Sequence, residues 1–301
     1  MAISRAQLVK ELEPGLNALF GLEYKQYGEQ WTEIFDTESS DRAFEEEVML
    51  AGFANAAVKP EGQGVGYDDA QETFTARYTN ETIALAFAIT EEAIEDNLYD
   101  RLASRYTKAL ARSMANTKQV KAAAVLNNGF NANFAGGDGV ALFATNHPTI
   151  AGTFSNELAV ASDLNETSLE QALIDIAAMT DERGLKIASR GMKLIIPSAL
   201  QFTADRLMKS EGRTGTADND INAVKNMGMI PEGYTVNHFL TSNKKWFIKT
   251  DVPNGLKHFV RSPIKTSMEG DFDTGNVRYK ARERYVFGFS DPRGIFGSDA
   301  V

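Results

Sequence analysis

Hydrophobic and polar positions alternate along residues 74–89, which read FTARYTNETIALAFAI. The first half sets Phe, Ala and Tyr between Thr and Arg, and the second half sets Ile, Leu and Phe between Thr and Ala. A period of two over this length predicts extended structure with two different faces. With a first limb at 48–58 and a glycine-bearing tip at 59–69, the pattern predicts a long two-stranded loop.

The pattern changes at Thr90, which can cap a helix, and Glu91 and Glu92 follow where the helix dipole favours acids. No Gly or Pro then occurs before Gly129, so the sequence predicts a helix of up to 38 residues. Its apolar positions fall every four residues, at Ile94, Leu98, Leu102, Tyr106, Leu110 and Met114. Each such step turns about 40° round a helix. We therefore expect an apolar stripe that winds round the helix and ends near Gly129.

The remaining pattern predicts an α+β fold, because helices and strands interleave without a βαβ repeat. Residues 1–45 read as an arm whose helical pattern is broken at Pro14 and Gly15. A helix with a capping box at Thr167 or Ser168 is predicted to run to Gly184, and another covers 198–209. Strands are predicted at 192–196, 234–240, 246–250, 256–261 and 277–289. The strands 234–240 and 246–250 are expected to pair with each other through a turn at Ser242-Asn243.

Charge is unevenly distributed along the chain, with 6 Lys and Arg against 21 Asp and Glu in residues 1–100. The remaining residues hold 25 basic against 20 acidic side chains. This asymmetry suggests that the acidic third docks on a basic surface, in the same chain or in neighbouring copies. An overall net charge of −10 argues against sequence-independent DNA binding. The chain has no cysteine, which excludes disulfides and thiolate metal sites.

Candidate chemistry is sparse. The histidines His147, His238 and His258 lie in different segments, and none has a metal-ligand partner at motif spacing. His147, before a proline, is interpreted as a turn residue, and His238 as a structural residue of a strand. The GxGxG at 62–66 is read as a hairpin tip because no helix start follows it. We therefore predict no catalytic residue, no cofactor and no metal, and we expect no signal peptide and no membrane span.

Four stretches together resemble the major capsid (major head) protein of tailed bacteriophages. They are 73–119 (TFTARYTNETIALAFAITEEAIEDNLYDRLASRYTKALARSMANTKQ), 138–156 (DGVALFATNHPTIAGTFSN), 192–208 (MKLIIPSALQFTADRLM) and 278–298 (RYKARERYVFGFSDPRGIFGS). The stretch 73–119 is similar to that family's extended loop and spine helix, and 138–156 is most similar to the Mu-type head subunits. The stretch 192–208 resembles the strand, proline and helix of the axial domain, and 278–298 resembles the closing strand and C-terminal tail.

The resemblance implies the tailed-phage capsid fold. An N-terminal arm would cover 1–45 and an extended loop 46–89. A peripheral domain would combine 90–160, with the spine helix, and 251–301, and an axial domain would cover 161–250. Axial domains would meet around hexamer and pentamer axes, and extended loops would lie over adjacent subunits.

The implied function is a major capsid protein that self-assembles into the icosahedral head around double-stranded DNA, without sequence-specific binding. The expected partners are other copies of the chain, a portal, a separate scaffolding protein or none, and a decoration protein as a further candidate. The expected location is the virion, after assembly in a bacterial cytoplasm. Two alternatives stay open: an encapsulin-type compartment shell protein of the same fold, and an α+β enzyme with an unrecognised site.

The charge asymmetry leads to a specific hypothesis, in which acids of the arm and loop pair with basic residues of adjacent subunits. The candidates are Glu45, Glu46, Glu47, Asp68 and Asp69 against Arg278, Arg282, Arg284 and Arg293. The competing interpretation places Arg282 and Arg284 on the solvent face of a strand.

Overall fold

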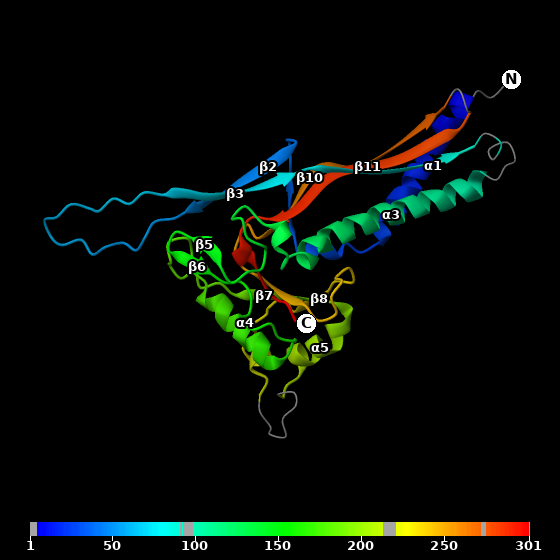
Figure 1. Cartoon of the computed structure of the whole chain (residues 1–301). Helices are drawn as coiled ribbons and strands as arrows, with labels where there is room; N and C mark the ends of the chain where they lie inside the picture. Colours follow the sequence, from blue (N-terminus) through cyan, green and yellow to red (C-terminus); the bar gives the residue numbers. More distant parts are fainter. Residues whose placement is uncertain (1–4, 91, 93–98, 213–220, 272–274, 301) are drawn as a thin grey trace.

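The computed structural model describes residues 5–90, 92, 99–212, 221–271 and 275–300 (Figure 1). A four-stranded sheet has the order β1 (Asp36–Ser39), β10 (Leu256–Gly270), β11 (Val277–Phe289) and β4 (Glu81–Ile89). β1 runs parallel to β10, and the other neighbours are antiparallel. We call this sheet the long sheet.

Two helices pack on one face of the long sheet, α1 (Arg5–Gln26) and α3 (Tyr99–Asn127). Apolar side chains from all three elements form one buried cluster, which includes Phe20, Leu110, Met114, Tyr279 and Ala281. The alternate residues of β11 that face the helices are therefore buried, while those between them point to the other side. The helices cover one face and leave the other open.

A second four-stranded sheet forms the core of a compact lobe. Its order is β12 (Ile295–Ser298), β9 (Trp246–Thr250), β7 (Gly191–Ile196) and β8 (Tyr234–Val236). The helices of this lobe are α4 (Glu166–Ala178), α5 (Gln201–Lys209) and α6 (Ala223–Asn226). Fully buried side chains such as Leu194, Trp246 and Phe296 join sheet and helices in one cluster. We call this unit the compact lobe.

A two-stranded ribbon projects from the body (Figure 1). It pairs β2 (Phe44–Ala51) with β3 (Gln71–Thr79), and we call residues 52–70 beyond the pairing the distal loop. A smaller hairpin pairs β5 (His147–Thr149) with β6 (Gly152–Phe154). Short 3₁₀ helices are η1 (Gln30–Glu33), η2 (Ala132–Phe134), η3 (Ser198–Leu200) and η4 (Pro292–Gly294).

The alternating segment 74–89 is divided between two sheets, which its pattern did not predict. Its first half belongs to β3 of the ribbon, and its second half is β4 of the long sheet. The division falls at Asn80, whose buried amide donates to Ser40 Oγ (2.7 Å) and to the Arg42 carbonyl (3.1 Å). Side-chain bonds to a neighbouring segment therefore decide where one ladder stops and the next begins.

The long helix is confirmed over Tyr99–Asn127, and its end just before Gly129 agrees with the expectation. A Cβ on Gly129 would lie 2.5 Å from the Phe143 ring, so only glycine fits there. The winding stripe is wrong at Tyr106, which is half exposed, because the buried line instead follows Ala103, Thr107 and Leu110. Spacings of three and four keep this line straight along the sheet.

Some predictions for the long helix fall on residues that the structure does not describe. Glu91 of the predicted first turn and the stripe positions Ile94 and Leu98 lie outside the described residues. The side chain of Leu102 is likewise outside them.

The predicted break at Pro14 and Gly15 is wrong, because α1 continues through both residues. Proline removes one hydrogen bond from a helix interior, and packing must offset that loss. Here Leu16 and Phe20 lie just beyond the proline and are buried against α3 and the long sheet. Tertiary contacts thus hold a helix that the local sequence disfavours.

Two local predictions in the compact lobe are also corrected. The strands β8 and β9 do not pair with each other, since β8 lies parallel and β9 antiparallel to opposite edges of β7. β7 is apolar and largely buried, which suits a central strand. The capping residue of α4 is Asn165, which exchanges hydrogen bonds with Ser168, and the helix ends at Ala178 rather than Gly184.

Candidate inter-subunit surfaces

The root of the ribbon is tied to the body by a buried polar network. The Glu47 carboxylate accepts hydrogen bonds from Lys257 Nζ and from Ser290 Oγ, and Ser290 also bonds to Tyr78. Lys257 Nζ lies 2.7 Å from Glu38 Oε1 as well. Burial lowers the pKa of Lys257, but the hydrogen bonds to Glu38 and Glu47 outweigh it and raise that pKa overall. The root of the ribbon is therefore fixed within the chain.

Beyond this root, the ribbon and distal loop expose an unusual number of apolar side chains. They are Val48, Leu50, Phe53, Val58, Val65 and Tyr67, the last of which is fully exposed. Every residue of 52–70 is exposed. Exposed apolar side chains that gather on one projecting segment favour a site of protein interaction. We name these six residues the apolar ribbon face.

The open face of the long sheet is basic. Along β11, Arg278, Lys280 and Arg282 are exposed and Arg284 is half-buried, all at alternate positions. Lys265 on β10 lies opposite Arg282 in the register, while small alanines of β4 lie opposite on the other side. We call Lys265, Arg278, Lys280, Arg282 and Arg284 the basic face. The alternation along β11 puts these arginines on the outward face of the sheet. Both interpretations, a solvent-facing strand and a surface for a neighbour, require this placement.

The acidic candidates lie on two parts of the ribbon. Glu45 accepts from Ser40 Oγ at 2.8 Å, and this hydrogen bond is the main cause that lowers its pKa. Glu46 lies 3.8 Å from Arg77 on the paired strand. Asp68 and Asp69 lie in the distal loop, where the Ala54 N–H is the main cause of a lowered Asp68 pKa.

Arg293 is buried and Glu47 is half-buried, and both are paired within their own chain. Arg293 donates to Glu182 Oε1 at 2.6 Å and to the Thr180 carbonyl at 2.8 Å, and lies 3.4 Å from Asp291. Burial raises the pKa of Asp291, against the opposing effect of Arg293. The remaining candidates lie nearer the surface, although Arg278 also has a partner in its own chain, Asp271.

The interpretation of His147 as a turn residue is wrong. The ring is fully buried, with Nδ1 2.6 Å from Asp138 Oδ2 and Nε2 3.1 Å from Asn156 Oδ1. Asn156 also donates to the carbonyls of Leu142 and Pro292. His147 and Asn156 thus fix the loop 138–156 to the C-terminal segment. The quoted motif 138–156 contains all three residues, so the signal was present, but their contacts were not readable.

The other two histidines are also structural in their contacts. His238 follows β8 rather than lying within a strand, and its ring nitrogen Nδ1 is 2.8 Å from Gln30 Nε2. His258 is buried in β10, stacked on Phe287 and edge-on to Trp31. Burial, together with the charge of Lys118, lowers the pKa of His258 to about 3.

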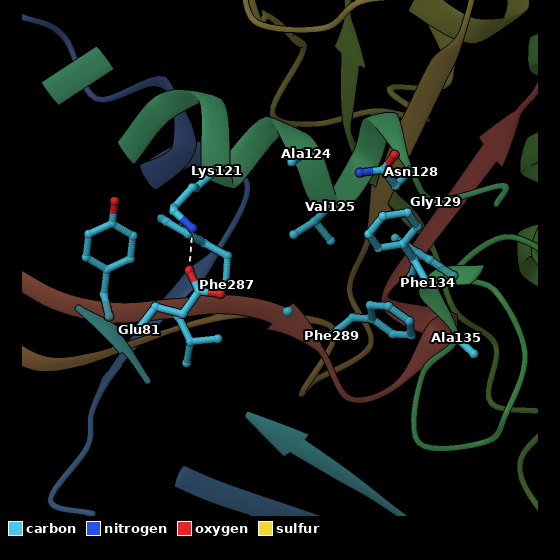
Figure 2. A pocket seen from close by; sticks show the side chains of 14 residues that line it. Glu81, Lys121, Ala124, Val125, Asn128, Gly129, Phe134, Ala135, Phe287 and Phe289 are labelled. Atoms are coloured by element: carbon cyan, nitrogen blue, oxygen red, sulfur yellow. Dashed lines mark hydrogen bonds and ion pairs between the residues drawn. The ribbon is translucent and has the colours of Figure 1, made fainter. Parts of the chain in front are cut away.

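A pocket of about 410 Å³ lies where the C-terminal part of α3 faces β11. Figure 2 shows Val125, Phe134 and Phe289 among its lining side chains, with Glu81 and Lys121 as an ion pair. These two are the charged residues of the lining, and each neutralises the other. The pocket therefore brings together no acid and base that are free for catalysis.

The described residues offer neither a cluster of metal ligands nor a membrane-spanning helix. They contain no group of three or more His, Asp and Glu side chains placed to hold a metal ion. None of the helices they form combines the length and the apolar character that a membrane span requires.

An α+β body with a projecting, uncovered ribbon is typical of a structural subunit rather than of a monomeric enzyme. A family model described as phage capsid protein matches residues 72–298, which is most of the chain. The chain therefore belongs to the phage capsid protein family. No curated protein matches the sequence.

Solved structures of shell subunits share the fold. The procapsid of bacteriophage JBD30 matches with a TM-score of 0.55 at 16% identity, over 98% of this chain and 76% of that chain. The capsid of an empty GTA particle matches with a TM-score of 0.55 at 14% identity, over 91% and 90%. A virus-like particle from Pyrococcus furiosus matches with a TM-score of 0.52 at 12% identity, over 94% and 98%. The expected capsid fold is confirmed.

Proposed function

We propose that this chain is the major capsid protein of a tailed bacteriophage, and that its copies assemble through hexamers and pentamers into an icosahedral head around double-stranded DNA. The family match supports the structural, shell-forming role. The single structural observation that supports self-assembly is the apolar ribbon face, which the described part of its own chain leaves uncovered. The compartment-shell alternative is not favoured, because the matching family model describes a phage capsid protein.

The arrangement of elements supports the assignment of each region to one of the proposed domains. The long sheet with α1 and α3 corresponds to the proposed peripheral domain, and the compact lobe to the proposed axial domain around the symmetry axes. The ribbon and distal loop correspond to the extended loop, which would lie over an adjacent subunit. We further propose a portal, a scaffolding protein and a decoration protein as partners. Assembly in the bacterial cytoplasm is likewise a proposal. The likeness to Mu-type head subunits rests on the motif 138–156.

The basic face is the proposed receiving surface for the acidic loop of a neighbour. Glu45, Glu46, Asp68 and Asp69 would supply the acids, and Lys280 and Lys265 join the predicted arginines as bases. An exposed ion pair contributes only about 0–1 kcal/mol. Each subunit of a closed shell repeats the contact, so that small terms sum to a stable particle.

The experiment combines negative-stain electron microscopy with light scattering of the purified protein and of the double variant K280E/R282E. The parent is expected to form shells, tubes or rings, and the variant to remain monomeric with an unchanged far-ultraviolet circular dichroism spectrum. The matched control is K186E/R190E, which changes the charge equally on exposed residues outside the basic face. It is expected to assemble like the parent.

Two outcomes would count against the proposal. Normal shells from K280E/R282E would rule out the basic face as a contact surface. A parent that stays monomeric at high concentration, with crowding agent and divalent cations present, would contradict unassisted self-assembly.

A further inference from the structure

We propose that Arg183 is a releasable clasp that fixes the direction in which the distal loop leaves the body. The claim about the monomer stands on its contacts alone. Its consequence for a shell rests on the proposed function.

The clasp joins both limbs of the loop at one point. Arg183 Nε donates to the Gly52 carbonyl at 3.2 Å, and Nη2 donates to the Asp69 carbonyl at 2.6 Å. Gly52 directly follows β2, and Asp69 lies just before β3. One guanidinium therefore bridges the two limbs where the backbone ladder of the ribbon stops, and its planar fork of donors suits this task.

Asp68 completes the clasp on the side of the loop. Its Oδ1 lies 3.9 Å from Arg183 Nη2, and its Oδ2 accepts from the Ala54 N–H at 2.7 Å. The carboxylate thus ties the two limbs to each other and faces the guanidinium. The side chain of Arg183 is 17% exposed, so the loop covers most of it while water retains access.

The base of the clasp is rigid. Asp181 Oδ1 accepts from the N–H groups of Arg183 (2.9 Å) and Leu185 (2.8 Å), which closes a tight turn. The preceding residue, Glu182, is buried and paired with Arg293 at 2.6 Å. Neighbouring side chains thus have opposite roles: Glu182 anchors the turn in the core, and Arg183 holds the loop.

The root of the ribbon is held differently. There the network of Tyr78, Ser290 and Glu47 is buried, and Gly137 approaches the Thr75 carbonyl so closely that a Cβ would lie 2.6 Å from it. The distal loop, in contrast, is exposed throughout. Opening the clasp breaks charge-assisted hydrogen bonds but exposes no buried apolar side chain.

It follows that the distal loop has a clasped direction and a released one, with the end of the ribbon as the pivot. Around a fivefold and a sixfold axis, the neighbour lies at a different angle. A loop held by a single opening contact can reach both neighbours without any change in the body.

The test uses double electron–electron resonance on the full chain. The sequence has no cysteine, so labels are placed by V65C in the distal loop and I174C on α4, both at exposed positions. The measurement is made at low protein concentration on the monomer fraction from size-exclusion chromatography, so it does not require that K280E/R282E blocks assembly. The clasped protein is expected to give one narrow distance distribution, and R183Q a broader distribution with a shifted mean.

Two further variants make the result specific. R183K, whose single ammonium cannot serve both carbonyls as a fork, is expected to broaden the distribution less than R183Q. R190Q, a nearby arginine outside the clasp, is expected to leave it unchanged. Thermal unfolding should be the same in all variants, because the contact lies outside the core.

An unchanged narrow distribution in R183Q, or an equally broad one in the parent, would overturn the proposal. The readout is taken on monomers and does not depend on shell formation. Loss of assembly in the parent would therefore contradict the proposed function and leave the clasp standing.

Discussion

The compact lobe and the ribbon use similar apolar residues in opposite ways. In the lobe, Leu194, Ile248 and Phe296 are fully buried between strands and helices of the same chain. In the ribbon, Leu50 and Tyr67 are exposed. Apolar burial supplies most of the stability of a folded domain, whereas an exposed apolar row is a cost until a partner covers it. The lobe therefore stabilises the subunit by itself, whereas the exposed apolar side chains of the ribbon and distal loop gain stability only under the proposed contact with a neighbour.

The difference arises because the lobe packs helices against a sheet, whereas the ribbon is a single layer of two strands. A two-stranded ribbon has too little surface to bury both its faces and is marginal by itself. The body compensates at the root, where the hydrogen bonds of Glu47 act together with a small buried cluster of Ala76, Tyr78 and Phe259. Beyond the root, nothing in the described chain covers the apolar ribbon face.

The largest expected effect tests this contrast directly. Phe296→Ala should lower the free energy of unfolding by about 3–5 kcal/mol, because it removes a fully buried ring and leaves a cavity. Leu50→Ala should change it by less than about 0.5 kcal/mol but should lower the yield of shells. Urea unfolding of the assembly-blocked monomer measures the first quantity, and light scattering of the assembling protein measures the second.

The comparison would be wrong if Leu50→Ala destabilised the monomer as much as Phe296→Ala. That result would mean that the ribbon folds back on its own chain in solution.

A smaller effect concerns His258, which is buried in β10 of the long sheet between these two regions in the chain's architecture. Its pKa is lowered to about 3 in the folded state, below the ordinary value of 6.5. Protons therefore bind the unfolded chain first, so the stability present above pH 6.5 is lost as the pH falls towards 3. At pH 5 the loss from this residue is about 2 kcal/mol, at 1.36 kcal/mol per unit.

The measurement compares His258→Phe with the parent in urea at several values between pH 7.5 and 5. Buried carboxyls with raised pKa values, such as Glu283 and Asp291, are present in both proteins and cancel in the difference. The difference should change in favour of the variant as the pH falls. A constant difference between His258→Phe and the parent across this pH range would contradict the burial argument.

The smallest effect concerns the start of α4 in the compact lobe. Asn165→Ala should cost about 1 kcal/mol, because the amide oxygen accepts from the Ser168 N–H at 2.9 Å. Thr167→Ala, at the exposed position where the sequence pattern suggested the cap, should change the stability by no more than a few tenths of a kcal/mol and in the favourable direction, because alanine has the higher helix propensity. Thermal unfolding measures the stability of both variants. An equal loss of stability would mean that Asn165 and Thr167 contribute equally to the start of the helix.

Much of the secondary structure was predictable because it depends on local periodicity. The alternation at 74–89 gave strands, the uninterrupted run before Gly129 gave the long helix, and the apolar run at 192–196 gave β7. Alternation along 277–289 likewise gave β11, whose charged positions form the basic face. These features follow from residues adjacent in sequence, so the chain determines them by itself.

Partnerships between distant segments were decided only by the tertiary structure. The pairing of β8 and β9 with β7, the helix that continues through Pro14, and the burial of His147 and Arg293 depend on contacts between segments far apart in the chain. A charged residue looks the same in the sequence whether it faces solvent or a buried counter-ion. The sequence by itself therefore determined the elements and the family likeness, and the tertiary structure decided which charges are buried and which are exposed, because burial is a property of the whole packed chain.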